Sequence, residues 1–220
     1  MIEDISGQVE PVNGEIADGR LLFRRLTSVA GEGSEGEVLF RTEKKNIILQ
    51  EARFNAWGGQ WKWIQNGEFQ VKGIDLSGLF PLADWPKAVS GKFSGSLTLD
   101  DQFSVLRGDL KSDTAGKLAL AGLEKYRLLP KTDLDTNLLS FTTAAFRDFQ
   151  FRTLSLRIVG RKNSVLLRFS GEGRPVKPIP FVLEKDGLFR PAVGNELGFD
   201  GNVEIGCGYR IPVSDFRKMH

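Results

Sequence analysis

The chain has 220 residues, of which 40% are hydrophobic and 26% charged, and its net charge is +2. This is the composition of a globular protein, and the near-neutral charge excludes a general attraction to nucleic acid. A single cysteine, Cys207, excludes an internal disulfide, and a single histidine, His220, excludes a His/Cys metal cluster within one chain.

Alternating apolar and polar residues dominate the first third of the chain, which is typical of strands. The stretches "ISGQVEPV", "GRLLFRRL", "EGEVLFRTE" and "NIILQEARFNAWGG" are predicted strands, with turns expected at "NGEI", at Asp18–Gly19 and near Lys44 to Asn46. The stretches "QWKWI" and "GEFQVKGIDL" predict a hairpin joined at "QNGE". The glycine string "GEGSEG" predicts a loop; no Gly-Lys-Ser/Thr follows it, so it is not a phosphate cradle.

The middle of the chain contains a break in this pattern and then a two-faced strand. The segment Asp75–Trp85, "DLSGLFPLADW", predicts a short helical turn capped by Asp75. In "SGKFSGSLTL", Ser90–Leu99, the apolar parity also carries Gly91 and Gly95. These glycines are expected to let the strand bend or to let a ligand approach the backbone.

The last third returns to strands after one predicted helix. The segment Asp133–Phe146 has apolar residues at helical spacing. The stretches "DFQFRTLSLRIVG", "NSVLLRFSGEG", "IPFVLEKDG" and "ELGFDGNVEIGCGYRIPV" are predicted strands, and "GEGRP" is a predicted loop. The fold class expected is mostly β: an antiparallel meander in a strongly curled sheet or groove, with one or two short helices. One domain over 1–220 is expected, with a possible subdivision near 75–90.

Residues that carry chemistry form no catalytic constellation in this sequence. The pair Asp100–Asp101 is expected at a hairpin turn, and Asp133 with Asp135 at a helix N-terminus. Cys207, in "IGCGY", has no histidine base nearby in the sequence. A non-enzymatic protein without a metal or other cofactor is therefore expected. A hydrolase with two facing carboxylates is a third and weaker hypothesis.

Three tryptophans lie close together in "WGGQWKW" and give an alternative hypothesis. If Trp57, Trp61 and Trp63 formed an exposed, coplanar row, they would suit stacking on a sugar. The same alternation fits a β-sandwich, in which a second sheet covers the apolar face. A β-sandwich that binds carbohydrate is therefore the second functional hypothesis. Burial of the tryptophans among phenylalanines would count against it.

The order of several segments resembles the bacterial AsmA-like family of envelope proteins, in particular the C-terminal region of its YdbH branch. The resemblance covers about Gly67 to Ile211. It rests on "IDLSGLFPLADWPKAVSGKFSGSLTLDDQFSVLRGDLKSDTAGKLAL", on "FRDFQFRTLSLRIVG" followed by "VLLRFSGEGRPV", and on "LGFDGNVEI". The family's usual Asn-Pro is Arg174–Pro175 here, and the closing tail departs from the pattern.

The resemblance implies a non-enzymatic, lipid-conducting groove that moves phospholipid between the inner and outer membranes. It implies a location in the periplasm, with an inner-membrane anchor in a segment absent from this chain. The chain would then be the C-terminal fragment of a longer envelope protein. Its expected partners are phospholipid acyl chains and a small outer-membrane lipoprotein that adds a strand at the C-terminal end. No nucleic-acid partner is expected.

Parity along the predicted strands gives the candidate residues for these contacts. An acyl chain would be held by apolar area rather than by specific polar groups. The candidates for the lipid groove are Phe54, Phe69, Val71, Phe93, Leu97, Leu99, Leu154, Leu156 and Leu166. The candidates for the edge that receives a partner strand are Val203, Ile205, Ile211 and Val213.

Overall fold

A computed structural model describes most of the chain. It covers residues 2–13, 16–28, 31–43, 46–76, 89–99, 105–120, 128, 144–161, 163–183, 189–191, 197–199 and 201–212. Everything below concerns these residues.

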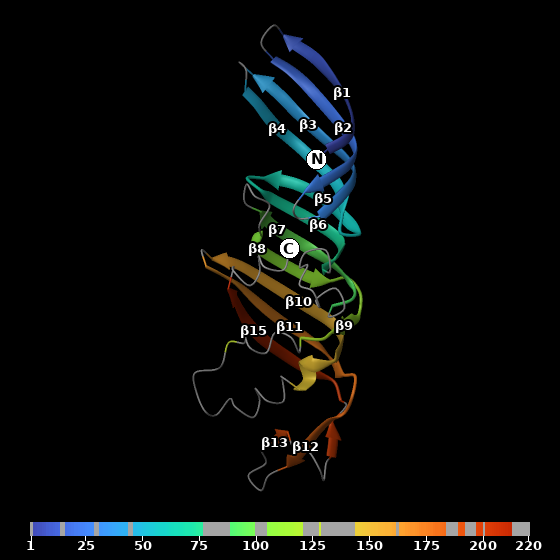
Figure 1. Ribbon diagram of the computed structural model, residues 1–220, viewed down its shortest axis with the longest axis vertical. Helices are drawn as coiled ribbons and strands as arrows, with labels where there is room; N and C mark the ends of the chain where they lie inside the picture. Colours follow the sequence, from blue (N-terminus) through green and yellow to red (C-terminus); the bar gives the residue numbers. More distant parts are fainter. Residues whose placement is uncertain are drawn as a thin grey trace.

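One twelve-stranded antiparallel sheet runs along most of the molecule (Figure 1). Its order is β1-β2-β3-β4-β5-β6-β7-β8-β10-β11-β15, and β9 pairs with β10 beyond the end of β8. The strands are β1 (Ile2–Asn13), β2 (Ile16–Ser28), β3 (Gly31–Glu43), β4 (Asn46–Ala56), β5 (Gly59–Gln65), β6 (Glu68–Asp75), β7 (Lys92–Leu99), β8 (Val105–Ser112), β9 (Gly116–Leu118), β10 (Phe149–Arg161), β11 (Ser164–Pro175) and β15 (Val203–Pro212).

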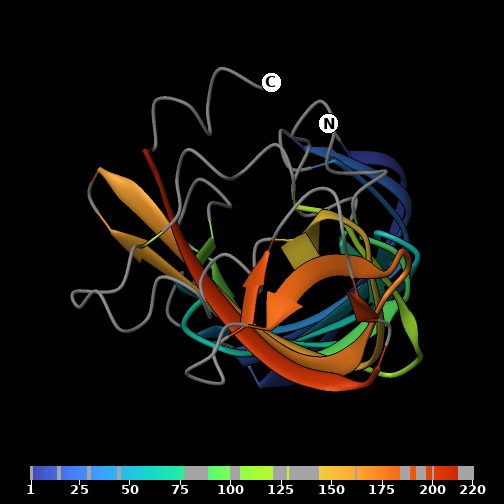
Figure 2. The same ribbon diagram turned by 90° about the horizontal axis from the view of Figure 1, so that it is seen from below.

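A smaller three-stranded sheet lies at the far end from β1 (Figure 1). It has the order β13-β12-β14, with β12 (Ile179–Leu183), β13 (Phe189–Pro191) and β14 (Leu197–Phe199). A single helical turn covers Ala144–Arg147. Viewed along the long axis, the large sheet curls, and this helical turn lies on the inner side of the curl (Figure 2).

The cross-strand register gives the large sheet two chemically distinct faces. On one face, a single row crosses eight strands in register: Phe54, Trp61, Val71, Gly95, Leu110, Leu156, Phe169 and Cys207. We call this the apolar face. Ala145 and Phe146 of the helical turn pack in the same buried cluster as these side chains, so the apolar face is the inner one.

The opposite face, which we call the charged face, has a continuous row of its own. It takes one residue from each strand of the large sheet except β9, and it reads Ser6, Leu22, Glu37, Arg53, Lys62, Gln70, Ser96, Asp109, Arg157, Arg168 and Gly208. Successive side chains of a strand point to opposite faces, so alternation in the sequence directly produces this separation.

The fold class predicted from the sequence is confirmed: the chain is mostly β, and its antiparallel sheet is open rather than closed into a barrel. The expected connections near Lys44 to Asn46 and at "QNGE" lie between β3 and β4 and between β5 and β6. In the second turn Asn66 and Gly67 have φ of 46° and 75°, as the favoured two-residue hairpin turn requires.

Three predicted turns or loops are wrong, and all involve glycine. Asp18–Gly19 lies inside β2, "GEGSEG" lies inside β3, and "GEGRP" forms the end of β11. The reason is cross-strand packing. Rings of the neighbouring strand occupy the space above Gly19 and Gly36, and the backbone of β10 occupies the space beside Gly171 and Gly173.

The two predicted helical segments lie largely outside the described residues. Of Asp133–Phe146, the structure describes Ala144 to Phe146, which are helical, and the turn extends to Arg147. Of Asp75–Trp85, it describes Asp75, which ends β6, and Leu76, which is helical. The expected turn at Asp100–Asp101 is also outside the described part, between β7 and β8.

Candidate functional site

The apolar face is covered at one end of the sheet and open at the other. From Trp61 to Phe169, every side chain of the row described above is buried. In the same row Phe54 is half-buried, and beyond it Phe23 is half-buried and Ile5, on β1, is 57% exposed. The face therefore loses its cover between β5 and β1.

The covered part packs under other segments of the same chain. The side chains that pack against it come from the helical turn, from segments between strands, and from the short strands β9 and β12. Leu120 donates its N–H to the carbonyl of Phe146, and Val89 bridges to Leu118, which ties these segments together. The covering residues are Leu76, Val89, Leu118, Leu120, Ala145, Phe146 and Ile179.

The open part forms what we call the N-terminal apolar patch, on β1 to β4. Its four cross-strand rows contain no charged residue, and Thr42 is the only polar one. The most open side chains are Ile47 at 75%, Val9 at 60% and Ile5 at 57%. Its positions are Ile5, Gly7, Val9, Pro11, Ala17, Gly19, Leu21, Phe23, Gly36, Val38, Phe40, Thr42, Ile47, Leu49 and Ala52.

The patch is about as large as the largest apolar patch on a typical monomeric protein. Four strands at about 4.8 Å spacing and four rows at about 6.6 Å spacing give roughly 20 Å by 14 Å, or about 300 Å². Contiguous apolar patches of this size on a protein surface are frequently binding sites.

Two aromatic rings shape the patch. The ring of Phe40 lies over Gly19, and the ring of Phe23 lies over Gly36, each on the neighbouring strand. Any Cβ at these glycines would collide with the ring. The two rings therefore lie flat over the glycines of the neighbouring strand, and the apolar surface continues across both strands.

Ion pairs organise the charged face behind the patch. Glu37 contacts both Arg20, at 2.5 Å, and Arg53, and Arg41 makes two hydrogen bonds to Asp18, at 2.7 and 3.1 Å. The hydrogen bond from Arg53, with the charges of both arginines, holds the pKa of Glu37 below its ordinary value. The hydrogen bond from Arg41 likewise lowers the pKa of Asp18.

A second ion-pair group lies on the charged face of β8 and β10. Asp109 accepts hydrogen bonds from Arg157 at 2.6 Å and from Arg107 at 3.3 Å. Partial burial raises the pKa of Asp109. The hydrogen bonds and charges of the two arginines lower this pKa by more than burial raises it, so it lies below its ordinary value.

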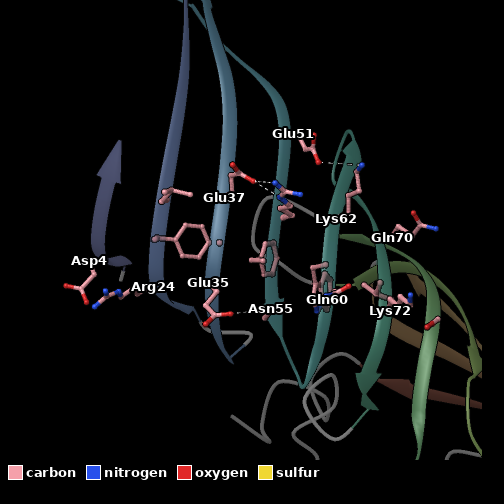
Figure 3. Close-up of a pocket in the computed structure, with 18 of the residues that line it drawn as sticks. Asp4, Arg24, Glu35, Glu37, Glu51, Asn55, Gln60, Lys62, Gln70 and Lys72 are labelled. Carbon is pink, nitrogen blue, oxygen red and sulfur yellow. Dashed lines mark hydrogen bonds and ion pairs between the residues drawn. The ribbon is translucent and has the colours of Figure 1, made fainter. Parts of the chain in front are cut away.

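A hollow of about 1090 Å³ lies along β1 to β7, and most of its lining side chains belong to the charged face (Figure 3). Acids such as Glu35 and Glu51 alternate with bases such as Lys62 and Lys72 along it. Lys62 pairs with Glu51 at 3.5 Å, and Asn55 donates to Glu35 at 3.2 Å. Because both signs of charge are mixed, the hollow selects neither an anion nor a cation.

Of the eight predicted groove residues whose side chains the structure describes, seven share the apolar face, and six of these are covered. Phe69, Val71, Phe93, Leu97, Leu154 and Leu156 are buried in the core, and Phe54 is half-buried at its border. In β11, Leu166 pairs with Val159, which is three residues from Leu156; because this number is odd, Leu166 faces the other side of the sheet. The side chain of Leu99 is outside the described part.

The two glycines of "SGKFSGSLTL" have different surroundings from those expected for a lipid contact. The place of a Cβ on Gly95 is occupied by the backbone carbonyl of Asp109 on β8. Gly91 has a φ of 109°, and a Cβ placed on it would lie 3.3 Å from the ring of Phe151. Of the two, Gly91 lies in a bend of the backbone just before β7, and at both glycines the chain itself occupies the adjoining space.

The tryptophans do not form an exposed row. Trp61 is 3% exposed, stacks on Phe54 at 5.8 Å and donates its indole N–H to the carbonyl of Ala56. Trp57 and Trp61 meet edge to face, at 78°, and Trp63 is half-buried. This arrangement is that of a packed core and disfavours sugar stacking.

The C-terminal edge of the sheet is β15, as the strand-addition hypothesis requires. Val203 is half-buried and Ile211 is fully buried, whereas the side chain of Ile205 and all of Val213 are outside the described part. The N–H of Leu128 donates to the carbonyl of Gly208 at 2.8 Å. Part of this edge is therefore already occupied by the chain.

The described residues contain no group of three or more His, Cys, Asp or Glu that could hold a metal ion. Cys207 is half-buried on β15, and the acids Asp100, Asp101, Asp133 and Asp135 lie outside the described part. Among the residues placed by the structure, no helix is long and apolar enough to cross a membrane.

Comparison with known proteins gives no relative. No protein-family description, no curated protein and no solved structure matches the chain.

Sequence reasoning missed the residues of the N-terminal apolar patch, apart from its border at Phe54. The positions of the charged residues along the predicted strands could have indicated this patch. In "GRLLFRRL" and "EGEVLFRTE" every charged residue from Arg20 to Arg24 and from Glu37 to Glu43 falls on one parity. A parity without charge on two consecutive strands indicates an apolar surface.

Proposed function

We propose that the chain is a non-enzymatic, lipid-binding segment of an open β-groove, in which the N-terminal apolar patch holds phospholipid acyl chains. The observation that carries the proposal is the patch itself: four strands wide, uncharged, and exposed at Ile5, Val9, Leu21 and Ile47. Burying about 300 Å² of it would contribute on the order of 7 kcal/mol before the costs of ordering the ligand.

The groove position differs from the one expected from the sequence. Acyl chains would lie on β1 to β4 and meet the border residue Phe54, rather than Phe93, Leu97, Leu154 or Leu156, which the chain itself covers. Beyond β4 the apolar face continues into the core. An open groove of this kind could be extended by further strands, which suits a protein that conducts lipid along its length.

As part of the same proposal, which the AsmA-like resemblance supports, the protein would lie in the bacterial periplasm and move phospholipid between the inner and outer membranes. A small outer-membrane lipoprotein would add a strand at β15. The uncovered stretch of that edge would have to accommodate it beside the bond from Leu128 to Gly208.

Two adjacent pairs of residues give a matched test of lipid binding. Leu21 and Leu22 are 38% and 39% exposed but lie on opposite faces, and Ile47 and Ile48 are also exposed on opposite faces. We expect the double variant L21Q/I47Q to bind a fluorescent phosphatidylethanolamine about 10-fold more weakly than the wild type, because both changes remove apolar contact area.

The control is L22Q/I48Q, which should bind the probe as the wild type does. Both variants are checked for folding by circular dichroism, and the purified wild-type chain is examined for bound phospholipid by native mass spectrometry. Equal losses in the two variants, or no bound lipid and no probe binding, would contradict the proposal.

A further inference from the structure

A second hollow, of about 740 Å³, lies on the charged face of β7, β8, β10, β11 and β15. The apolar-face residues along it, such as Leu110, are buried on the other side of the sheet, so the side chains around the hollow are those of the charged face. The first hollow, along β1 to β7, contains acids and bases in similar numbers. The described lining of the second contains one acid, Asp109, and three bases, Lys111, Arg157 and Arg168.

Small residues form the floor of this second hollow. One cross-strand row reads Ser94, Lys111, Ser155, Ser170 and Gly206. Ser155 and Ser170 lie opposite each other and are both exposed. A Cβ added at Gly206 would lie 3.5 Å or more from the nearest described atom, so close packing does not require a glycine there. Its lack of a side chain leaves room beside the two serine hydroxyls.

The next row places two arginines directly opposite each other. Arg157 on β10 pairs in register with Arg168 on β11, and like charges in this position repel. The charge of Arg157 is partly compensated, because its Nε donates to Asp109 at 2.6 Å. Arg168 and Lys111 are exposed, and neither forms an ion pair with a residue that the structure describes. Two cations without a described counter-charge therefore flank the two serines.

The rows on either side of the serines hold three acids, and two of these already have partners. Asp109 accepts hydrogen bonds from two arginines, and Glu172 accepts one from Arg152 at 2.6 Å. Glu204 lies opposite Glu172, on the other side of the serine row from Arg168. The side of the hollow that carries the arginines is therefore the positive one.

We propose that this hollow is a binding site for a phosphate group. The two serine hydroxyls would donate hydrogen bonds to its oxygens, and Lys111, Arg157 and Arg168 would supply the opposite charge. Guanidinium groups suit this role because they bind phosphate through two hydrogen bonds at once. The hollow and the N-terminal apolar patch lie on opposite faces and on different strands, so this proposal does not rest on lipid binding at the patch.

Titration of the isotope-labelled chain with inorganic phosphate, at an ionic strength held constant with sodium chloride, tests the site. We expect the amide NMR signals of Ser155, Ser170 and Gly206 to shift. The double variant Lys111→Gln/Arg168→Gln should bind phosphate about 10-fold more weakly, because it removes two of the three charges. It should fold as the wild type does, since both side chains are exposed.

The matched control is Lys62→Gln/Lys72→Gln, which changes the net charge equally but lies at the first hollow. It should bind phosphate as the wild type does. Glu204→Gln should act in the opposite direction and strengthen binding about 2-fold, because it removes a nearby like charge. Equal losses in the two double variants would overturn the proposal.

Vesicles distinguish a phosphate group in solution from one on a lipid. Phosphatidic acid exposes a terminal phosphate, whereas phosphatidylcholine does not. Sedimentation with phosphatidic acid vesicles that depends on Lys111 and Arg168, without binding of inorganic phosphate, would assign the site to a lipid head group. Binding of inorganic phosphate without sedimentation would assign it to a phosphate in solution. If neither probe bound in a way that depends on these two residues, the proposal would be wrong.

Discussion

Gly95 lies where two strands approach too closely for any side chain. Its φ is 153°, and the carbonyl of Asp109 fills the place of its Cβ. Beside it, Gly73 has a φ of 66° and donates its N–H to the hydroxyl of Ser94 at 3.0 Å. The register between β6 and β7 shifts at the same level, between Val71 and Ile74. Together these residues bend β6 and β7 at one place.

Gly95→Ala should therefore destabilise the protein by about 2–4 kcal/mol, because the new methyl group would meet backbone and the φ would be strained. Gly206→Ala, on β15, is the control. The nearest atom to its added Cβ is 3.5 Å away, so its effect should stay within about 1 kcal/mol. Urea unfolding measures both, and similar losses would contradict the role given to Gly95.

Ion pairs between neighbouring strands hold the charged side chains of β2, β3 and β4 on the charged face. Glu37 lies between Arg20 and Arg53, and Asp18 is held by Arg41, each on a neighbouring strand. Exposed ion pairs contribute little stability individually. Their main effect is on register, because slipping a strand by one residue would carry its charges onto the apolar face.

Acid should remove the stabilisation that the ion pairs of Glu37 provide, and a comparison with Glu37→Gln measures this loss. The pKa of Glu37 is below its ordinary value of 4.5 in the folded chain, so its stabilisation is present above pH 4.5. That stabilisation is lost as the pH falls through the folded pKa. The melting temperature of the wild type should thus fall more steeply below pH 4.5 than that of Glu37→Gln.

Glu10→Gln, which removes an acid without an ion-pair partner in the described part of the chain, is the control for this measurement. Its acid-induced fall should match that of the wild type, since the ion pairs of Glu37 remain in both. Parallel curves for the wild type and Glu37→Gln would show that the Glu37 pairs carry no pH-dependent stability.

The apolar face of the large sheet is covered by other segments at one end of the molecule and exposed at the other. From β5 to β15 the apolar face packs under the helical turn and the segments between strands, whereas β1 to β4 expose their apolar side chains. Local stability follows buried apolar contact. The sheet is continuous in hydrogen bonding but not in its protection from water.

Native-state hydrogen exchange should show this difference. Amides of β2 and β3 should exchange faster than those of β10 and β11, although each of these strands is paired on both sides. Adding phosphatidylethanolamine in detergent micelles should slow exchange in β2 and β3 and leave β10 and β11 unchanged. Uniform exchange across all four strands would contradict the prediction that β2 and β3 are less protected than β10 and β11.

Much of the fold could be predicted because alternation and hairpin turns are local signals. The antiparallel order of β1 to β6 follows from strands joined by short turns, as at Asn66–Gly67. The glycine strings of β3 and β11 are misleading because glycine favours loops locally. Only the partner strand, with Phe23 over Gly36, shows why glycine is needed there.

The site was harder to predict than the fold. Alternation looks the same whether the apolar face is covered or open, so Leu97 and Leu21 have similar patterns and opposite exposures. Parity also fails where apolar residues are consecutive. In β11 the run Val165, Leu166 and Leu167 fills both faces, and parity alone assigns Leu166 to the wrong one.

The uninterrupted neighbour-to-neighbour order of β1 to β8 limits how the length of such a sheet can change. Each strand reverses the direction of the one before it. Deleting one strand would therefore turn everything downstream over and put its apolar residues on the opposite side. Deleting or inserting a complete hairpin restores the direction and keeps all apolar residues on one side. A protein built in this way can be lengthened or shortened only in even steps, two strands at a time.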